Sequence, residues 1–359
     1  MALSKPAAAL TLSLKDKLDF IPALASICLA AFYSILTGLR RGERQAQSFF
    51  LHIGYAIFRK ATVRLSPLQM QYVMPPTNKI YDMFVKKARV LPQTVDLGHG
   101  AQGHWVGDSN ADNVLVWYHG GGFSLPANLG YFNFFARIID DMHRAGKSIA
   151  VFSLTYTLAP HATYPTQLRQ SVECLRHVLD KTHHTPSSVY IGGDSAGGNL
   201  VGGVLSHIAH PHPQIAPLPL AEDLAGAIMI APWTNLDTEF VDHDIYAGGD
   251  LITHGVAKPW AGAYLGGAKR DYYTDLSLAP SDWYNDFRVG SVLVLAGGNE
   301  ILLPIIQDLM AKFQAGFSPV EFFVGRRECH VAPIYNLYLG DQSETQQGKK
   351  LKEWLRESL

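Results

Sequence analysis

Residues Ser188 to Gly203 read SVYIGGDSAGGNLVGG, and this stretch determines which fold the chain adopts. The run Val189 to Ile191 predicts a strand, and the small residues after it predict a turn into a glycine-led helix. Within the turn, Gly193 to Gly197 matches G-x-S-x-G, the pattern of a nucleophile elbow. Such a turn strains its apex residue, so the neighbours two positions away must be small. We therefore expect Ser195 at the top of a sheet, where a helix dipole favours negative charge.

A second glycine motif lies upstream, directly after another predicted strand. The run Asn113 to Tyr118 (NVLVWY) ends in HGGGF at His119 to Phe123. Consecutive glycines let the backbone approach a ligand closely and aim its N–H groups at an oxyanion. The pattern G-x-S-x-G alone recurs in ordinary turns, but the two motifs together indicate a serine hydrolase.

The chain resembles the hormone-sensitive-lipase branch of the α/β-hydrolases. The motifs that carry this resemblance are HGGGF at 119–123, YTLAP at 156–160, YPTQL at 164–168, GDSAGG at 193–198 and SLAP at 277–280. LTYTLAP, APWTNL at 231–236 and a hydrophobic N-terminus are most similar to fungal members of the steryl-acetyl-hydrolase type and to esterases of fungal secondary-metabolite pathways. The resemblance implies an α/β fold with a mostly parallel central sheet, helices on both faces and an N-terminal helical lid.

The order of the predicted elements favours the same architecture. Residues 94–107 predict an opening antiparallel hairpin, and strand-like and helix-like segments alternate after it. The strands are expected at 114–118, 149–154, 189–191, 227–230, 292–295 and 320–324, and helices near 131–145, 166–180 and 346–359. Alternation of this kind builds a mostly parallel sheet covered on both faces, with function at the carboxyl ends of its strands. Residues 65–91 are rich in Met and Tyr and have an irregular pattern, and they fall in the segment expected to form a lid.

A serine hydroxyl needs a base within hydrogen-bond reach, and the base needs an acid to orient it. Among fifteen histidines, His330 follows the last predicted strand, where this fold delivers its base. The acid is expected just beyond strand 292–295, where Glu300 stands at the place that usually holds Asp in the branch. Asp308 is the alternative acid.

The resemblance implies further roles around Ser195. The oxyanion hole is expected to consist of the N–H groups of Gly121, Gly122 and Ala196. His119 is expected to shape this loop by hydrogen bonding. The histidines near the elbow are expected to be mostly solvated: His183, His184, His207, His210 and His212. No site role is expected for the aromatic residues between 239 and 287.

Composition excludes some classes of function. The 359 residues are 47% hydrophobic and 17% charged, which suits one large α/β domain with a lid. The net charge of −1 gives no electrostatic case for nucleic acid. The three cysteines, at 28, 174 and 329, have no metal-ligand spacing, and neither a metal nor an organic cofactor is implied.

Residues Phe20 to Leu39 form an uncharged apolar run of bilayer-spanning length. Basic residues flank it on both sides, at 15 and 17 and at 40, 41 and 44, so the charges barely decide an orientation. Leu39-Arg40-Arg41 is a poor signal-peptide cleavage site. The sequence predicts a membrane anchor, with the endoplasmic reticulum as the expected location; the alternative is a buried or lid helix in a cytoplasmic protein.

The chain is thus expected to comprise a tail at 1–19, a transmembrane helix at 20–39, a helical lid at 40–93 and a catalytic domain at 94–359, with a substrate-pocket excursion at 239–287. The predicted function is a serine carboxylesterase or deacetylase acting on a short-chain ester of a sterol, terpenoid or polyketide alcohol, in fungal secondary metabolism. An acyl-transferring or lactone-acting enzyme would use the same triad. A non-hydrolytic scaffold or ligand-binding protein stays open because Leu303 and Pro304 replace the Arg and Asp that often follow the acid.

Overall fold

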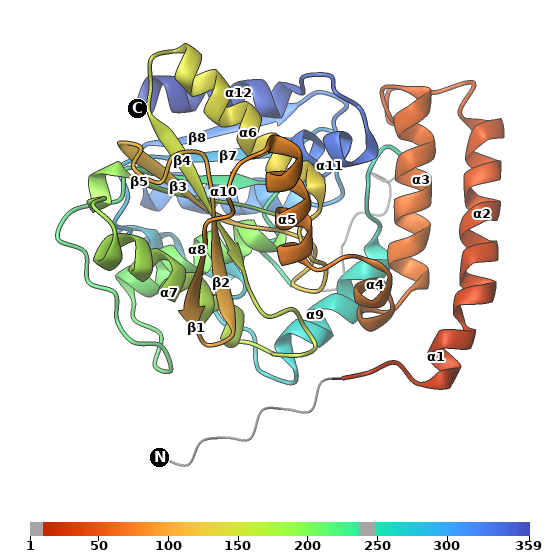
Figure 1. Cartoon of the computed structure of the whole chain (residues 1–359), viewed down its shortest axis with the longest axis horizontal. Coiled ribbons are helices and arrows are strands. Elements are labelled where there is room, and N and C mark those ends of the chain that lie inside the picture. The colour runs from red at the N-terminus through yellow and green to blue at the C-terminus, as the bar shows by residue number, and fades with distance from the viewer. Residues whose placement is uncertain (1–9, 237–247) are drawn as a thin grey trace.

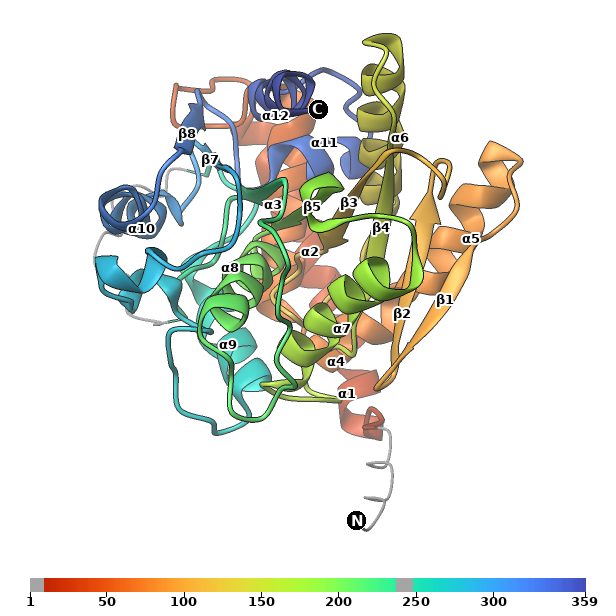
Figure 2. The same cartoon turned by 90° about the vertical axis from the view of Figure 1, so that its left-hand side faces the viewer.

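A central sheet organises the computed structural model, which describes residues 10–236 and 248–359. Its strand order is β1-β2-β4-β3-β5-β6-β7-β8, and Figure 2 shows β1 on one side of the molecule and β8 on the other. The strands are β1 (Thr94–Gly98), β2 (Ala101–Val106), β3 (Asn113–Tyr118), β4 (Ile149–Thr155), β5 (Val189–Asp194), β6 (Gly226–Ile230), β7 (Val292–Gly297) and β8 (Val320–Gly325).

The sheet is parallel from β4 to β8 in this order, whereas β1–β2 and β2–β4 pair antiparallel. The expected hairpin at 94–107 and the mostly parallel α/β sheet are therefore confirmed. Every residue from Val114 to Tyr118 is fully buried, as expected for a central strand covered on both faces.

Helices cover both faces of the sheet (Figure 1). On one side lie α6 (Leu129–Arg144), α11 (Ala332–Leu339) and α12 (Gln346–Ser358), and on the other lie α7 (Thr166–Lys181) and α8 (Ala196–Ala209). α10 (Leu303–Gly316) packs against β7 and β8. Since each parallel strand ends at the same edge of the sheet, the loops after β3, β5, β6, β7 and β8 meet there.

The N-terminal part is helical: α1 (Leu14–Leu18), α2 (Phe20–Thr37), α3 (Phe49–Arg64), α4 (Pro67–Val73) and α5 (Thr77–Ala88). Residues 65–91 are mostly helical, in agreement with the helical segment expected at 40–93. A capping box between Ser66 and Gln69, with Pro67 at the first helical position, begins α4. Pro76 directly precedes α5.

α2 coincides with most of the predicted anchor, and the helical stretch Leu14–Thr37 that contains α1 and α2 is, by length and composition, able to cross a membrane. α2 lies along α3 at the outer edge of the molecule (Figure 1). The region predicted to build part of the substrate pocket, 239–287, includes α9 (Ala257–Leu265), whereas its residues 239–247 lie outside the described part of the chain.

Candidate active site

Ser195 occupies the sharp turn between β5 and α8. Its backbone dihedrals are φ 52° and ψ −116°, a left-handed region that ordinary residues avoid. A Cβ on Gly197 would lie 1.8 Å from the Tyr118 carbonyl oxygen, and one on Gly193 would lie 2.4 Å from the Gly197 carbonyl oxygen. The elbow geometry expected from G-x-S-x-G is therefore present, and only glycine fits on either side of the turn.

The glycine loop after β3 approaches the same point. Gly121 and Gly122 have φ of +96° and +58°, and both line one cavity with Ser195. Within residues 10–236 and 248–359, no acceptor is bonded to the N–H of Gly121, Gly122 or Ala196. Unpaired N–H groups beside a serine hydroxyl suit an oxyanion hole, the role predicted for these three residues.

A buried carboxylate that the sequence did not single out holds this loop. Asp194 Oδ1 accepts hydrogen bonds from Gly120 N at 3.1 Å and Trp117 Nε1 at 3.2 Å. Its Oδ2 accepts one from the Tyr131 hydroxyl at 2.7 Å. Burial raises the pKa of Asp194 to about 6, against the hydrogen bonds that favour its charge. One side chain thus ties the glycine loop to the residue before the nucleophile.

His119 has the shaping role that was expected of it. Its Nδ1 lies 2.8 Å from the Gly120 carbonyl oxygen, and its ring stacks on Tyr156 with centroids 4.3 Å apart. Complete burial lowers the pKa of His119 to about 4, so the ring is neutral at physiological pH.

His330 and Glu300 form a buried pair. His330 Nδ1 lies 3.2 Å from Glu300 Oε1, and the Gly297 N–H donates to Glu300 Oε2. Because a carboxylate only accepts, Nδ1 carries the proton, which leaves Nε2 free to act as a base. Asp308, the alternative acid, lies on α10 with a half-exposed side chain and pairs with Lys312 at 3.0 Å. The structure brings Glu300, not Asp308, to the histidine.

Asp250, which no sequence pattern singled out, bonds to the backbone of His330 and to that of Ile301, the neighbour of Glu300. Its Oδ1 accepts from His330 N at 2.7 Å and Leu251 N at 2.6 Å, and its Oδ2 accepts from Ile301 N at 2.9 Å. A single buried carboxylate therefore links the loop of the base to the loop of the acid. Burial raises the pKa of Asp250 to about 6.

The negative charges around His330 set its protonation. Burial opposes the charged imidazolium, but the hydrogen bond that His330 donates to Glu300 and the charges of Glu300, Asp250 and Asp194 outweigh it. The pKa of His330 therefore lies above its ordinary value.

We expect Asp250→Asn to lower kcat on a soluble ester by roughly tenfold, since it weakens the bonds that place His330 and Glu300. The base works only when neutral, so removing a negative charge lowers the pKa of His330 and moves the acid limb of the kcat/KM profile to lower pH. A pH profile of both proteins tests this. A fall in kcat with an unmoved acid limb would show that Asp250 is only structural.

The cavity beside Ser195 contains about 530 Å³ of empty space, counting the part open to solvent. Its walls are mainly apolar and come from distant parts of the chain: Phe58, Leu125, Trp233, Leu251, Trp260 and Tyr335. Trp260 is one of the aromatic residues between 239 and 287, for which no site role was expected, yet it lines the cavity. It packs on the glycine loop so tightly that a Cβ on Gly122 would lie 1.9 Å from its ring.

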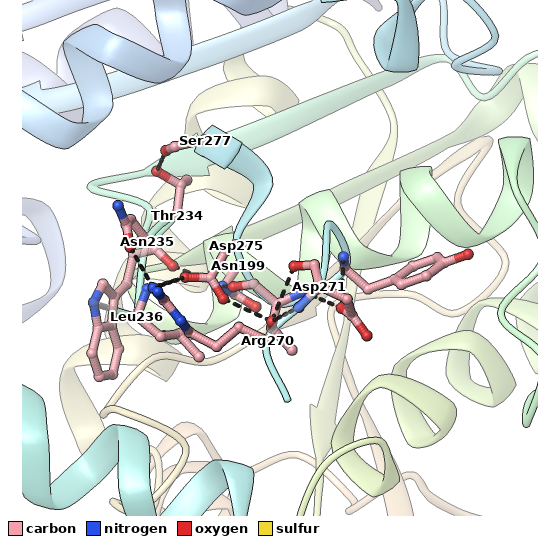
Figure 3. A network of polar contacts seen from close by, with 11 residues as sticks. Asn199, Thr234, Asn235, Leu236, Arg270, Asp271, Asp275 and Ser277 are labelled. Carbon is pink, nitrogen blue, oxygen red and sulfur yellow. Dashed lines mark hydrogen bonds and ion pairs between the residues drawn. The ribbon is translucent and has the colours of Figure 1, made fainter. Parts of the chain in front are cut away.

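A polar network holds the wall that carries Trp233 (Figure 3). Asn199 Nδ2 donates to the carbonyl oxygens of Trp233, at 2.7 Å, and Thr274. Asp275, fully buried, accepts from Leu236 N and pairs with Arg270 at 3.1 Å. These bonds attach the loop after β6 to residues 270–275, so buried hydrogen bonds fix the position of this wall.

The histidines near the elbow are mostly buried, contrary to the expectation that they are solvated. Nε2 of His184 and of His207 lie 2.9 Å and 3.1 Å from backbone carbonyl oxygens. Burial lowers the pKa of both, and of His212. These neutral rings serve packing. Across the described residues, no group of three or more His, Cys, Asp or Glu is placed to hold a metal ion.

Comparison with known proteins agrees with this geometry. A family model described as alpha/beta hydrolase fold matches residues 115–334. Steryl acetyl hydrolase 1 of Saccharomyces cerevisiae is 33% identical over 132 residues, which cover 36% of this chain and 28% of that protein. Carboxylesterase NlhH of Mycobacterium tuberculosis is 39% identical over 90 residues, covering 24% and 27%. The match thus spans less than a third of either relative. The crystal structure of an esterase/lipase from an uncultured bacterium superposes with a TM-score of 0.60 at 25% identity, covering 80% of this chain and 93% of that one.

Proposed function

This chain belongs to the α/β-hydrolase fold family, as an esterase of the hormone-sensitive-lipase type, and from that premise we propose that it hydrolyses a short-chain ester of a hydrophobic alcohol. One observation carries the proposal. Ser195, His330 and the loop of Gly121 and Gly122 line a single apolar cavity, and His330 is paired with Glu300. A nucleophile, a base with its acid and unpaired N–H donors are what ester cleavage requires.

The proposed reaction proceeds in two steps. Ser195 Oγ attacks the ester carbonyl while His330 Nε2 takes its proton, and Glu300 stabilises the imidazolium. The oxyanion accepts hydrogen bonds from the N–H groups of Gly121, Gly122 and Ala196, each worth on the order of 3 kcal/mol. His330 then protonates the leaving alcohol as the C–O bond breaks. Water, deprotonated by the same base, releases the acid and restores Ser195.

The substrate class follows from the walls of the cavity. Apart from Ser195, His330, Thr253 and the Tyr335 hydroxyl, the lining side chains are apolar, so the cavity favours an ester with few polar groups. The similarity to a steryl acetyl hydrolase supports an acetylated sterol, terpenoid or polyketide. We also propose a role in secondary metabolism, from the motif resemblance, and a location at the endoplasmic reticulum, from the apolar N-terminal helix.

We expect kcat/KM on p-nitrophenyl esters to be highest for acetate to butyrate and to fall roughly tenfold or more by palmitate, because the cavity beside Ser195 has to hold the alcohol as well as the acyl chain. The series is measured on one enzyme preparation, with a fluorophosphonate label that counts active sites. Rates that rise with chain length would contradict the short-chain proposal. An unlabelled Ser195 with every ester unreacted would favour the non-hydrolytic scaffold.

A transferase or a lactone-acting enzyme would share this site, and the products separate these activities. Mass spectrometry of a reaction that contains both water and an acceptor alcohol shows free acid for a hydrolase and a new ester for a transferase.

A further inference from the structure

One side of α2 presents a continuous apolar surface to solvent. At 100° per residue, this side lies opposite Ala23 and Ser34, the buried residues that face the body of the protein. Its members are 44–73% exposed: Ile21, Leu29, Phe32, Ile35 and Leu36. Leu14 and Leu18 of α1 are 73% and 58% exposed and extend the surface. An exposed apolar surface of this extent marks an interaction site.

Both ends of α2 are fastened to the body. At the start, Arg64 of α3 donates two hydrogen bonds to the Asp19 carboxylate, at 2.6 Å and 2.8 Å. Gln69 of α4 donates to Asp19 Oδ2 at 3.1 Å and to the Asp16 carbonyl oxygen at 2.9 Å. At the far end, Thr37 Oγ1 lies 3.4 Å from His52 Nε2. A helix that crossed a bilayer alone would have to break these contacts and uncover the apolar side of α3.

An apolar groove runs beneath this surface, between α2, α3, α4 and α11. It holds about 1160 Å³ of empty space, counting the part open to solvent. Leu24, Ile57 and Val73 line it and are 62%, 38% and 54% exposed, so apolar side chains surround its opening. Phe58 lines both the groove and the cavity of Ser195, and its ring packs edge-on against Tyr335 with centroids 5.1 Å apart. The groove therefore adjoins the active site.

We propose that α1 and α2 lie flat in one leaflet of an anionic phospholipid bilayer, without crossing it, and that the ester reaches Ser195 from this leaflet through the groove past Phe58. The second part rests on the proposed function. The first part, on how α1 and α2 bind the bilayer, replaces the spanning anchor expected from the apolar run with an in-plane anchor.

The charges next to the apolar surface fit this occupant. Lys15 and Lys17 lie before α2 and Arg40 and Arg44 after it, and all four are exposed. Basic side chains at both ends of an in-plane helix contact the phosphate groups of a single leaflet, and an anionic surface attracts each of them. The apolar side between them is buried roughly 5–10 Å into the leaflet.

Vesicle flotation of the full chain tests binding, with phosphatidylcholine vesicles that contain phosphatidylglycerol. The variant Ile21→Glu/Phe32→Glu is expected to lose the bound fraction by roughly tenfold or more, because it places two charges in the apolar layer. Leu278→Glu, at a residue 45% exposed outside α1 and α2, is the matched control and should float like the wild type. Equal flotation of the double variant and the wild type would overturn the proposal. So would a stable dimer in solution that the double variant dissociates and that binds no vesicles.

The depth of Cys28 separates the in-plane from the spanning arrangement. Cys28 is exposed near the middle of the outward side of α2, while the other two cysteines are buried, so a thiol-reactive fluorophore labels it selectively. Quenching by lipids that carry a spin label at different depths then locates it. An in-plane helix places it within roughly 10 Å of the headgroups. A position at the bilayer centre, roughly 15 Å deep, would overturn the proposal.

Kinetics test the access route separately. The double variant should hydrolyse a soluble short-chain ester within twofold of the Leu278→Glu control, and lose roughly tenfold on an ester dissolved in the vesicles. A double variant that hydrolyses both esters at the rate of the Leu278→Glu control would overturn the route through the groove. If the wild type hydrolyses neither ester, the proposed function fails, while flotation and depth still decide how α2 binds.

Discussion

Ser195→Ala is expected to lower kcat on p-nitrophenyl acetate by a factor on the order of 10⁵ to 10⁶, the loss seen when the nucleophile of a serine hydrolase is removed. The unpaired N–H groups of Gly121 and Gly122 remain in this variant and sustain a residual rate above that in water. Single-turnover and steady-state assays measure the fall, and the variant should take up no fluorophosphonate.

The variant should fold like the wild type, because alanine has the same backbone restrictions at the strained φ of Ser195. Ser187→Ala, at an exposed serine shortly before β5, is the matched control and should keep the wild-type rate within twofold. A Ser195→Ala protein that retains more than about one hundredth of the wild-type kcat would show that another group is the nucleophile.

Glu300→Gln is expected to lower kcat on the same ester by roughly 10³ to 10⁴. The Gly297 N–H donates to Oε2 of Glu300, so the glutamine carbonyl keeps that place and its amide nitrogen faces His330 Nδ1. Nδ1 must then accept, which moves the ring proton to Nε2 and removes the base. The fold loses little, since the substitution preserves shape.

Asp308→Asn is the control for the acid and should leave kcat within twofold, because Asp308 is half exposed and pairs with Lys312 on α10. A large loss in Asp308→Asn together with a small loss in Glu300→Gln would reverse the assignment. The pH profile of the Asp308 variant should also match that of the wild type.

The parts of the site that the sequence predicted depend on local rules. The elbow around Ser195 and the loop at Gly121 and Gly122 each need small residues at fixed spacing, and the structure shows the close contacts that enforce it. Glu300 and His330 could be placed because each follows a strand that the apolar pattern reveals. Their pairing is an outcome of the parallel sheet, which brings both loops to one edge.

The missed residues act over long distances in the chain. Asp250 bonds to residues 51 and 80 positions away, and no spacing rule connects them. Trp260 reads like any buried aromatic residue, since its contact with Gly122 exists only after folding. The buried His184 and His207 were expected to be solvated because they flank helices, yet each finds a carbonyl partner in a neighbouring loop. The short α4 is marked by its capping box, whereas α5 is marked by residues that it buries at helical spacing: Thr77, Ile80, Tyr81 and Val85.

The carboxylate of Asp250 also bonds to the N–H of Leu251, which begins a stretch of cavity wall that includes Ile252 and Thr253. An ester too wide for the cavity would have to displace this wall outward. Because Asp250 bonds to the wall and also to the N–H groups of His330 and Ile301, the displacement would shift the loops of the base and the acid as well. Wide esters would then bind and hold the catalytic residues out of alignment. Such an enzyme selects its substrates by the speed of turnover rather than by the strength of binding, so its best substrate need not be its tightest ligand.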